Sequence, residues 1–175
     1  CRQEGGAAIM AEAYGKLTGK PGSCMVTRGP GATNASAGVH VAHQDSTPMI
    51  LLVGQIGRDM VDREAFQEVD YRKMFEPLCK WVGQIDDINR IPEYLSHAYH
   101  IATSGRPGPV VLALPEDMLS SSAEVPDAKP YVPIEAKTAP EDVSRFHNAL
   151  KSAKQPIMIV GGGGWTREAT ENLKS

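Results

Sequence analysis

Strand-like apolar runs alternate with segments of helical periodicity over residues 4–114, and this alternation restricts the fold more than any other feature. The runs expected to form strands are Cys24–Thr27, Pro48–Gly54, Cys79–Val82 and Val110–Leu114. Apolar residues recur at helical spacing over Glu4–Leu17 and Ile88–Thr103, which predicts helices there. Two further helices are expected, a small-residue helix over Thr33–His43 and a short one over Asp70–Phe75. Strands that alternate with helices favour an α/β fold, with an open parallel sheet and helices on both of its faces.

The pattern changes after residue 118. Prolines punctuate residues 119–139 without any periodicity, which is typical of an interdomain linker. A new α/β pattern then begins, with a helix over Pro140–Ala153, a strand over Pro156–Val160, four glycines and the start of another helix. We therefore expect a first domain over 1–118, lacking its first βα unit, and the truncated beginning of a second over 140–175. The chain is expected to be a fragment of a longer polypeptide.

Composition excludes several classes of function. The chain has 175 residues, of which 41% are hydrophobic, so it has enough apolar residues for a core. Its net charge is −3 and its basic residues are scattered, which argues against nucleic acid as a partner. No apolar run approaches the roughly 20 residues of a membrane helix, so no membrane contact is expected. Three cysteines without metal-type spacing are interpreted as buried free thiols of a cytoplasmic protein.

Glu4 and the turn Gly29-Pro30-Gly31 are the candidates for a ligand site. Glu4 opens the first expected helix, which should end at Gly19 and Pro21. The turn follows a strand and precedes a helix, where open α/β sheets bind ligands and where glycine lets a ligand approach the backbone. A carboxylate near such a turn can hold a flat nitrogen heterocycle. Each feature also has a purely structural explanation, since acidic residues stabilise helix N-termini and tight βα turns are common.

Two further motifs give weaker signals. Gly161–Gly164 suggests a dinucleotide-type turn, but its spacing does not complete the fingerprint. The pairs His40/His43 and His97/His100 have the i, i+3 spacing of metal ligands on a helix. No matching cluster of cysteine or carboxylate residues supports them, so solvated or hydrogen-bonded histidines are favoured and no metal site is predicted.

Several segments, taken together and in order, resemble the thiamine-diphosphate-dependent enzymes. The resemblance rests on Arg2–Ala7, Ala13–Gly22, Thr27–Asn34, Asp45–Pro48, Val53–Gln55, Ala65–Glu68, Ser104–Val110 and Leu114–Asp117. Their order and spacing are most similar to the large catalytic subunits of acetolactate synthases and their carboligase relatives. The resemblance covers residues 1 to about 120, and residues 140–175 resemble the start of the family's central domain.

This resemblance implies a pyrimidine-binding domain. In the family, a glutamate at the position of Glu4 hydrogen-bonds N1′ of the aminopyrimidine and so activates the cofactor for loss of its C2 proton. The positions that match the family's turn against the pyrimidine are Gly29, Pro30, Gly31 and Asn34. Phe66, Gln67 and Lys80 match positions that reach the active site from the neighbouring subunit. A core phenylalanine and a solvated lysine are the ordinary alternatives for Phe66 and Lys80.

The resemblance also implies a reaction and its partners. The expected enzyme is a carboligase acting on pyruvate or a similar 2-oxo acid, as in branched-chain amino acid biosynthesis, with thiamine diphosphate, Mg²⁺ and, in the acetolactate synthase group, FAD. It would be a homodimer or homotetramer, because two subunits share each cofactor. The Mg²⁺ ligands belong to a C-terminal domain of which this sequence contains nothing, so the fragment alone is expected to be inactive.

Some residues depart from the family pattern and keep other interpretations open. Gln3 replaces a frequent histidine, and Arg28 stands where a small serine is usual. The loop 59–64 lacks the usual Gly-Thr. These departures leave the substrate open. A 2-oxo-acid decarboxylase, a glyoxylate carboligase, a sulfoacetaldehyde acetyltransferase and a non-catalytic ligand-binding module are the alternatives.

Overall fold

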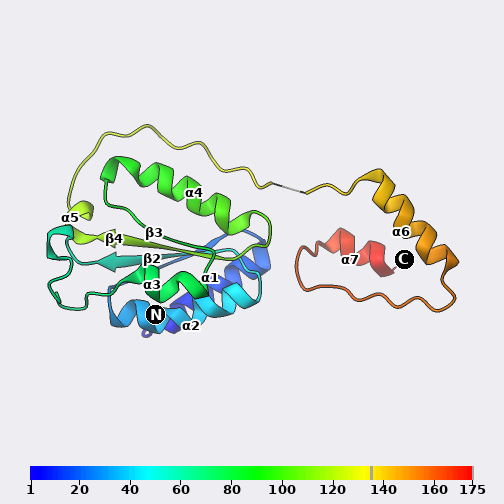
Figure 1. Cartoon of the computed structure of the whole chain (residues 1–175), viewed down its shortest axis with the longest axis horizontal. Helices are drawn as coiled ribbons and strands as arrows, with labels where there is room; N and C mark the ends of the chain where they lie inside the picture. The colour runs from blue at the N-terminus through cyan, green and yellow to red at the C-terminus, as the bar shows by residue number, and fades with distance from the viewer. Residues whose placement is uncertain (135, 175) are drawn as a thin grey trace. The chain divides into compact units, whose positions relative to one another are not determined.

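The computed structural model describes residues 1–134 and 136–174 (Figure 1). The chain divides into two compact units, the first of which ends at Ile134. The first unit holds the sheet, and each unit is described by itself.

The first unit contains a four-stranded sheet with the strand order β1-β2-β4-β3, in which every neighbouring pair is parallel. The strands are β1 (Gly22–Val26), β2 (Met49–Gln55), β3 (Trp81–Gln84) and β4 (Pro109–Pro115). Val26 pairs with Val53, which pairs in turn with Ala113, so the carboxyl ends of the central strands lie at one edge. The predicted parallel α/β fold is confirmed, although β3 begins two residues later than expected.

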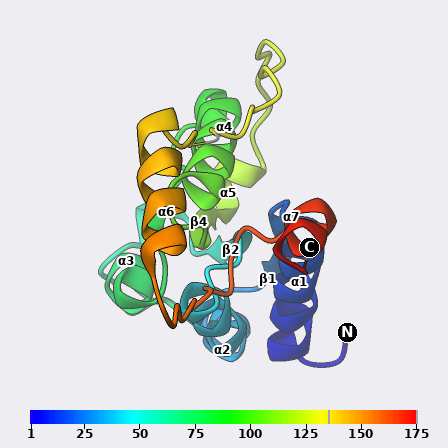
Figure 2. The ribbon, with the colours of Figure 1, turned by 90° about the vertical axis from the view of Figure 1, so that its right-hand side faces the viewer.

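Helices cover both faces of this sheet, as Figures 1 and 2 show. One face carries α1 (Glu4–Thr18), α2 (Pro30–Gln44) and α3 (Tyr71–Phe75), with Leu51 and Phe75 in its fully buried core. The other face carries α4 (Ile91–Thr103) and the short α5 (Glu116–Leu119), packed on Ile50 and Leu112. Alternate residues of β2 thus face different cores, which explains its nearly unbroken apolar sequence.

Local sequence signals fix the ends of these helices. The side chain of Gln3 accepts a hydrogen bond from the Gly6 amide at 2.9 Å and caps α1. Gly19 ends α1 in the left-handed conformation with φ 69°, as predicted. Pro30 occupies the first turn of α2, where a missing N–H costs nothing.

The second unit contains α6 (Pro140–Ser152) and α7 (Arg167–Lys174). The strand predicted over Pro156–Val160 is wrong, because these residues are irregular and Ile157 and Ile159 are 91% and 92% exposed. A strand is stable only beside a partner, and the described part of this unit contains no other strand. None of the helices in the described residues is long and apolar enough to cross a membrane.

The cysteines differ in exposure. Cys24 and Cys79 are buried free thiols, as predicted, whereas Cys1 is exposed, so the expectation of three buried thiols is wrong at this position. Cys79 donates hydrogen bonds to the carbonyls of Phe75 and Trp81, at 3.2 and 3.3 Å. Burial raises the pKa of the Cys79 thiol to about 12.

The raised pKa of Cys79 makes stability fall at alkaline pH. The buried thiol keeps its proton in the folded state while the unfolded chain loses it above about pH 8.5, so unfolding is favoured as pH rises. We expect this group to lower the free energy of unfolding by about 1.4 kcal/mol per pH unit above that point, until the folded thiol titrates. Urea denaturation from pH 8 to 10 measures the slope, and Cys79→Ala should flatten it. An equal slope in both proteins would contradict the prediction.

Candidate functional site

Glu4 and Asn34 meet at the carboxyl edge of the sheet. Glu4 is the first residue of α1, and Asn34 lies one turn beyond Pro30 in α2. The Asn34 Nδ2 atom donates a hydrogen bond to Glu4 Oε2 at 3.0 Å. Because α1 and α2 pack side by side with both N-termini at this edge, the sequence brings these two side chains together from 30 residues apart.

The Glu4 carboxylate is held in its ionised form. The hydrogen bond from Asn34 is the main cause that lowers its pKa, and the Glu4 backbone N–H acts in the same direction. Its place in the first turn of α1 also favours a negative charge. The site therefore presents an ionised carboxylate at neutral pH.

The turn Gly29-Pro30-Gly31 begins α2 at the same edge. Gly29 has φ 60° and ψ −112°, and a Cβ atom there would lie 2.7 Å from the Cβ of Gln67. Its amide donates a hydrogen bond to the Tyr71 hydroxyl at 2.8 Å. A Cβ atom at Gly31 would lie 2.8 Å from Thr27 Cγ2. Close packing therefore favours glycine at both positions, and the backbone conformation favours it at Gly29 as well.

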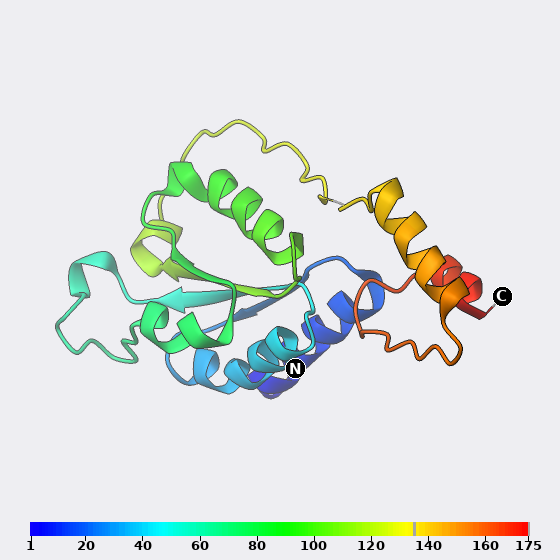
Figure 3. The same ribbon diagram turned by 45° about the vertical axis from the view of Figure 1, so that its right-hand side comes forward.

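Phe66 and Gln67 lie on the loop that joins β2 to α3, which extends past the carboxyl ends of the strands in Figure 3. Gln67 has φ 66°, unusual for a residue other than glycine, and packs against Gly29. Phe66 is 79% exposed, so the alternative that it belongs to the core is wrong. Within one chain, this loop thus meets the glycine turn.

Lys80 lies at the opposite edge of the sheet from Glu4 and the glycine turn. Its backbone N–H donates a hydrogen bond to the Pro109 carbonyl at 2.8 Å, at the start of β4 and hence at the amino edge of the sheet. Its ammonium donates hydrogen bonds to the carbonyls of Ile101 and Ser104, in the last turn of α4 and just after it. Burial lowers the Lys80 pKa. The structure groups Glu4, Asn34, the glycine turn and Gln67, and leaves Lys80 apart from them.

Two contacts at the site were not predicted from the sequence. Tyr71 holds the Gly29 amide, and Arg28 forms an ion pair with Glu116 through Nη1 and Oε2 at 2.7 Å. These partners are 42 and 88 residues apart, so no local pattern could have paired them. The one available signal was Arg28 itself, a large charged residue beside a glycine turn.

The arrangement fits the aminopyrimidine end of thiamine diphosphate. One carboxylate oxygen of Glu4 accepts from Asn34, and a carboxylate has about four lone-pair positions, so acceptor capacity remains for a ring N–H. Its ionised state suits that role. In residues 1–134 and 136–174, no group of three or more histidine, cysteine or acidic residues could hold a metal ion. The site thus offers a contact for a nitrogen heterocycle.

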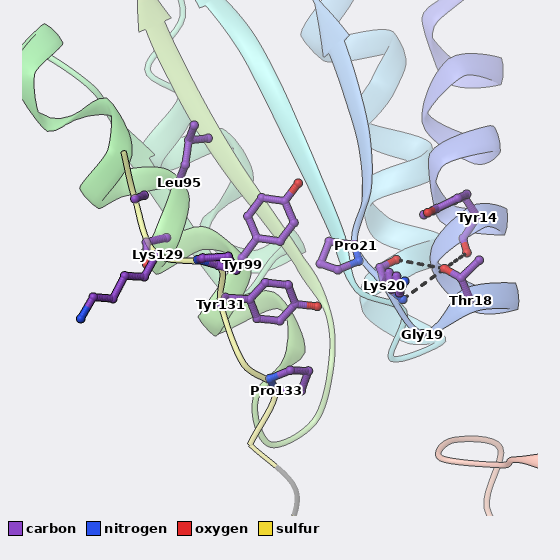
Figure 4. Close-up of a pocket in the computed structure, with 13 residues that line it drawn as sticks. Tyr14, Thr18, Gly19, Lys20, Pro21, Leu95, Tyr99, Lys129, Tyr131 and Pro133 are labelled. Carbon is purple, nitrogen blue, oxygen red and sulfur yellow. Dashed lines mark hydrogen bonds between the residues drawn. The ribbon is translucent and has the colours of Figure 1, made fainter. Parts of the chain in front are cut away.

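A separate cavity of about 780 Å³ opens near the amino edge of the sheet (Figure 4). The turn between α1 and β1, the helix α4 and the segment 128–133 enclose it. Tyr99 and Tyr131 stack beside it with their ring centroids 5.2 Å apart, while the Lys129 side chain points away from these rings. Neither Glu4 nor the glycine turn lines this cavity, so it does not belong to the candidate site.

The chain is similar in sequence to known proteins. Residues 1–74 match the profile of a family described as "Thiamine pyrophosphate enzyme, N-terminal TPP binding domain". The chain is 39% identical to the acetolactate synthase large subunit of Haemophilus influenzae, over 98% of this chain and 31% of that protein. It is 38% identical to a probable acetolactate synthase large subunit of Methanococcus aeolicus, over 98% of this chain and 30% of that protein.

The large subunit of acetolactate synthase isozyme 3 from Escherichia coli is 36% identical, over 99% of this chain and 31% of that protein. The chain thus spans less than a third of the length of these relatives.

Proposed function

We propose, because residues 1–74 match the N-terminal domain family of thiamine pyrophosphate enzymes, that this chain is the pyrimidine-binding part of a thiamine-diphosphate-dependent carboligase. The proposed substrate is pyruvate or a similar 2-oxo acid, as the names of the relatives suggest. The observation that carries the proposal is the ionised Glu4 carboxylate, which Asn34 orients beside the turn Gly29-Pro30-Gly31.

The residues of the chain have distinct roles in this proposal. Glu4 accepts a hydrogen bond from N1′ of the aminopyrimidine, and Asn34 fixes the direction in which the carboxylate points. Gly29 and Gly31 let the turn pack closely against Gln67 and Thr27, which fixes the start of α2 beside the proposed ring site. When bound, thiamine diphosphate supplies the nucleophilic carbon, while the protein supplies position and proton management.

The remaining parts of the proposed enzyme lie outside this chain. Mg²⁺ and the diphosphate would be held by a C-terminal domain of a second copy, which makes a homodimer the smallest active form. FAD would bind outside the site formed by Glu4. Phe66, Gln67 and Lys80 are our candidates for contacts with the neighbouring subunit, and Lys80 would serve a different surface from Gln67 because the two lie at opposite edges of the sheet.

A product assay tests the proposal. The full-length protein, supplied with pyruvate, thiamine diphosphate and Mg²⁺, is expected to release carbon dioxide and form acetolactate, and the isolated 175-residue chain is expected to form none. Acetaldehyde as the sole product would identify a decarboxylase instead. Lack of turnover on pyruvate, glyoxylate and sulfoacetaldehyde would refute carboligation of these substrates.

Flavin content separates the acetolactate synthase group from the alternatives. We expect FAD in the purified full-length protein, detected by its absorbance and released on denaturation. A flavin-free protein that still consumes pyruvate would favour a simple decarboxylase. A non-catalytic module is the less favoured alternative, because a binding module has no need of an ionised carboxylate at the position of Glu4.

A further inference from the structure

The ion pair between Arg28 and Glu116 joins the ends of two strands that are not neighbours. Arg28 follows β1 and Glu116 follows β4, while β2 lies between them in the sheet. The two side chains cross the carboxyl end of β2 to meet at 2.7 Å. The Arg28 side chain is 26% exposed and that of Glu116 is 59% exposed, so the pair lies at the surface of the site.

Arg28 also binds the loop between β2 and α3. Its Nε atom donates a hydrogen bond to the Phe66 carbonyl at 3.3 Å, while Nη1 binds Glu116. The next residue, Gly29, packs against Gln67. One guanidinium thus connects the end of β4, the Phe66 backbone and the glycine turn.

The loop needs such support because its backbone is strained. Asp62, Glu64 and Gln67 have φ angles of 63°, 52° and 66°, in the left-handed region that other residues than glycine seldom occupy. The Glu68 carboxylate stabilises the loop from within by accepting hydrogen bonds from the amides of Asp62 and Ala65. These bonds do not attach the loop to the sheet.

A second ion pair anchors the start of the same loop. The Arg58 side chain binds Asp117 at 2.7 Å, and the Arg58 amide donates to the other oxygen of Asp117 at 3.0 Å. Asp117 is the neighbour of Glu116, so two adjacent acidic residues after β4 hold the loop at two points. Of these two attachment points, the one formed through Arg28 lies nearer to Phe66 and Gln67.

We infer that Arg28 and Glu116 are positioning residues, which hold Phe66 and Gln67 against the glycine turn and so shape the wall of the substrate site. The link to substrate rests on the proposed function, whereas the link to the loop does not. Surface ion pairs add little to global stability, so removal of this pair should affect the loop rather than the fold.

Hydrogen exchange of the 175-residue chain tests the link to the loop. Glu116→Gln is expected to speed exchange of the Asp62, Ala65 and Glu68 amides by about fivefold. Arg28→Lys should do the same, because lysine keeps the charge but cannot bind Glu116 and Phe66 through one planar fork. The matched control is Glu93→Gln, which removes the pair of 2.6 Å between Glu93 of α4 and Arg90 just before this helix, and which should leave the loop unchanged.

Steady-state kinetics of the full-length protein test the link to substrate. Glu116→Gln is expected to raise KM for pyruvate by about fivefold while kcat changes by less than about twofold. Unchanged loop exchange, or equally faster exchange throughout the chain, would overturn the positioning role. Faster loop exchange with unchanged KM would overturn its link to substrate. If the unmodified full-length protein has no activity on pyruvate, the proposed function fails, and the exchange experiment still decides the structural role.

Discussion

Replacing Glu4 by glutamine in the full-length protein is expected to lower kcat by about 10²- to 10⁴-fold, because a neutral amide cannot act as the carboxylate partner of N1′. The fold should survive, since the Glu4 side chain is partly exposed and takes no part in the core. The measurement is the rate of deuterium exchange at C2 of bound thiamine diphosphate, together with the dissociation constant of the cofactor. Exchange should slow by a similar factor.

Two variants test whether the lower activity of Glu4→Gln comes from loss of the carboxylate that assists removal of the C2 proton. Glu93→Gln changes a carboxylate on α4 and should keep full exchange. Asn34→Ala removes the hydrogen bond that lowers the Glu4 pKa, so that pKa should rise towards its ordinary value. The carboxylate would then protonate at higher pH, and the acid limb of the pH–rate profile should move upward. Rapid C2 exchange in Glu4→Gln, or an unmoved acid limb in Asn34→Ala, would contradict the role of Glu4.

The parts of the fold that were predicted from the sequence depend on local signals. Apolar periodicity located the helices and strands of the first unit, and Gly19 marked the end of α1 through its backbone conformation. The same local reasoning failed at Pro156–Val160. An apolar run of that length carries the signal of a strand, but whether it becomes one depends on a partner strand that no local pattern provides.

At the site, the sequence indicated the chemical groups but not their contacts. Glu4 and the glycine turn stood out because of their residue types and positions. The hydroxyl of Tyr71 on Gly29 and the pairing of Arg28 with Glu116 arise only from the order of strands in the sheet. The position of Lys80 at the other edge likewise follows from the direction of β3, which the resemblance alone did not reveal.

Close packing of α1 on α2 is expected to control both stability and the site. Gly38 of α2 lies against Ala8 of α1, and a Cβ atom at Gly38 would lie 2.5 Å from the Ala8 Cβ. Gly38→Ala should therefore lower the free energy of unfolding by about 1–3 kcal/mol, because the two helices must separate. The cost of separating the helices should exceed the gain of about 1 kcal/mol in helix propensity that alanine has over glycine, so the net effect should be destabilising. Chemical denaturation measures the net change.

Separation of α1 from α2 should also weaken the Glu4–Asn34 hydrogen bond, because these residues lie near the N-termini of the two helices. The double variant Gly38→Ala with Ala8→Gly removes the clash with the Ala8 Cβ but leaves the new Cβ 2.8 Å from the Ala8 carbonyl carbon, so it should recover only part of the lost stability and of the cofactor affinity in the full-length protein. Gly161→Ala, where an added Cβ meets nothing within 4 Å, is the control for the substitution itself. If the double variant is no more stable than Gly38→Ala, the separation of α1 from α2 is set by other contacts.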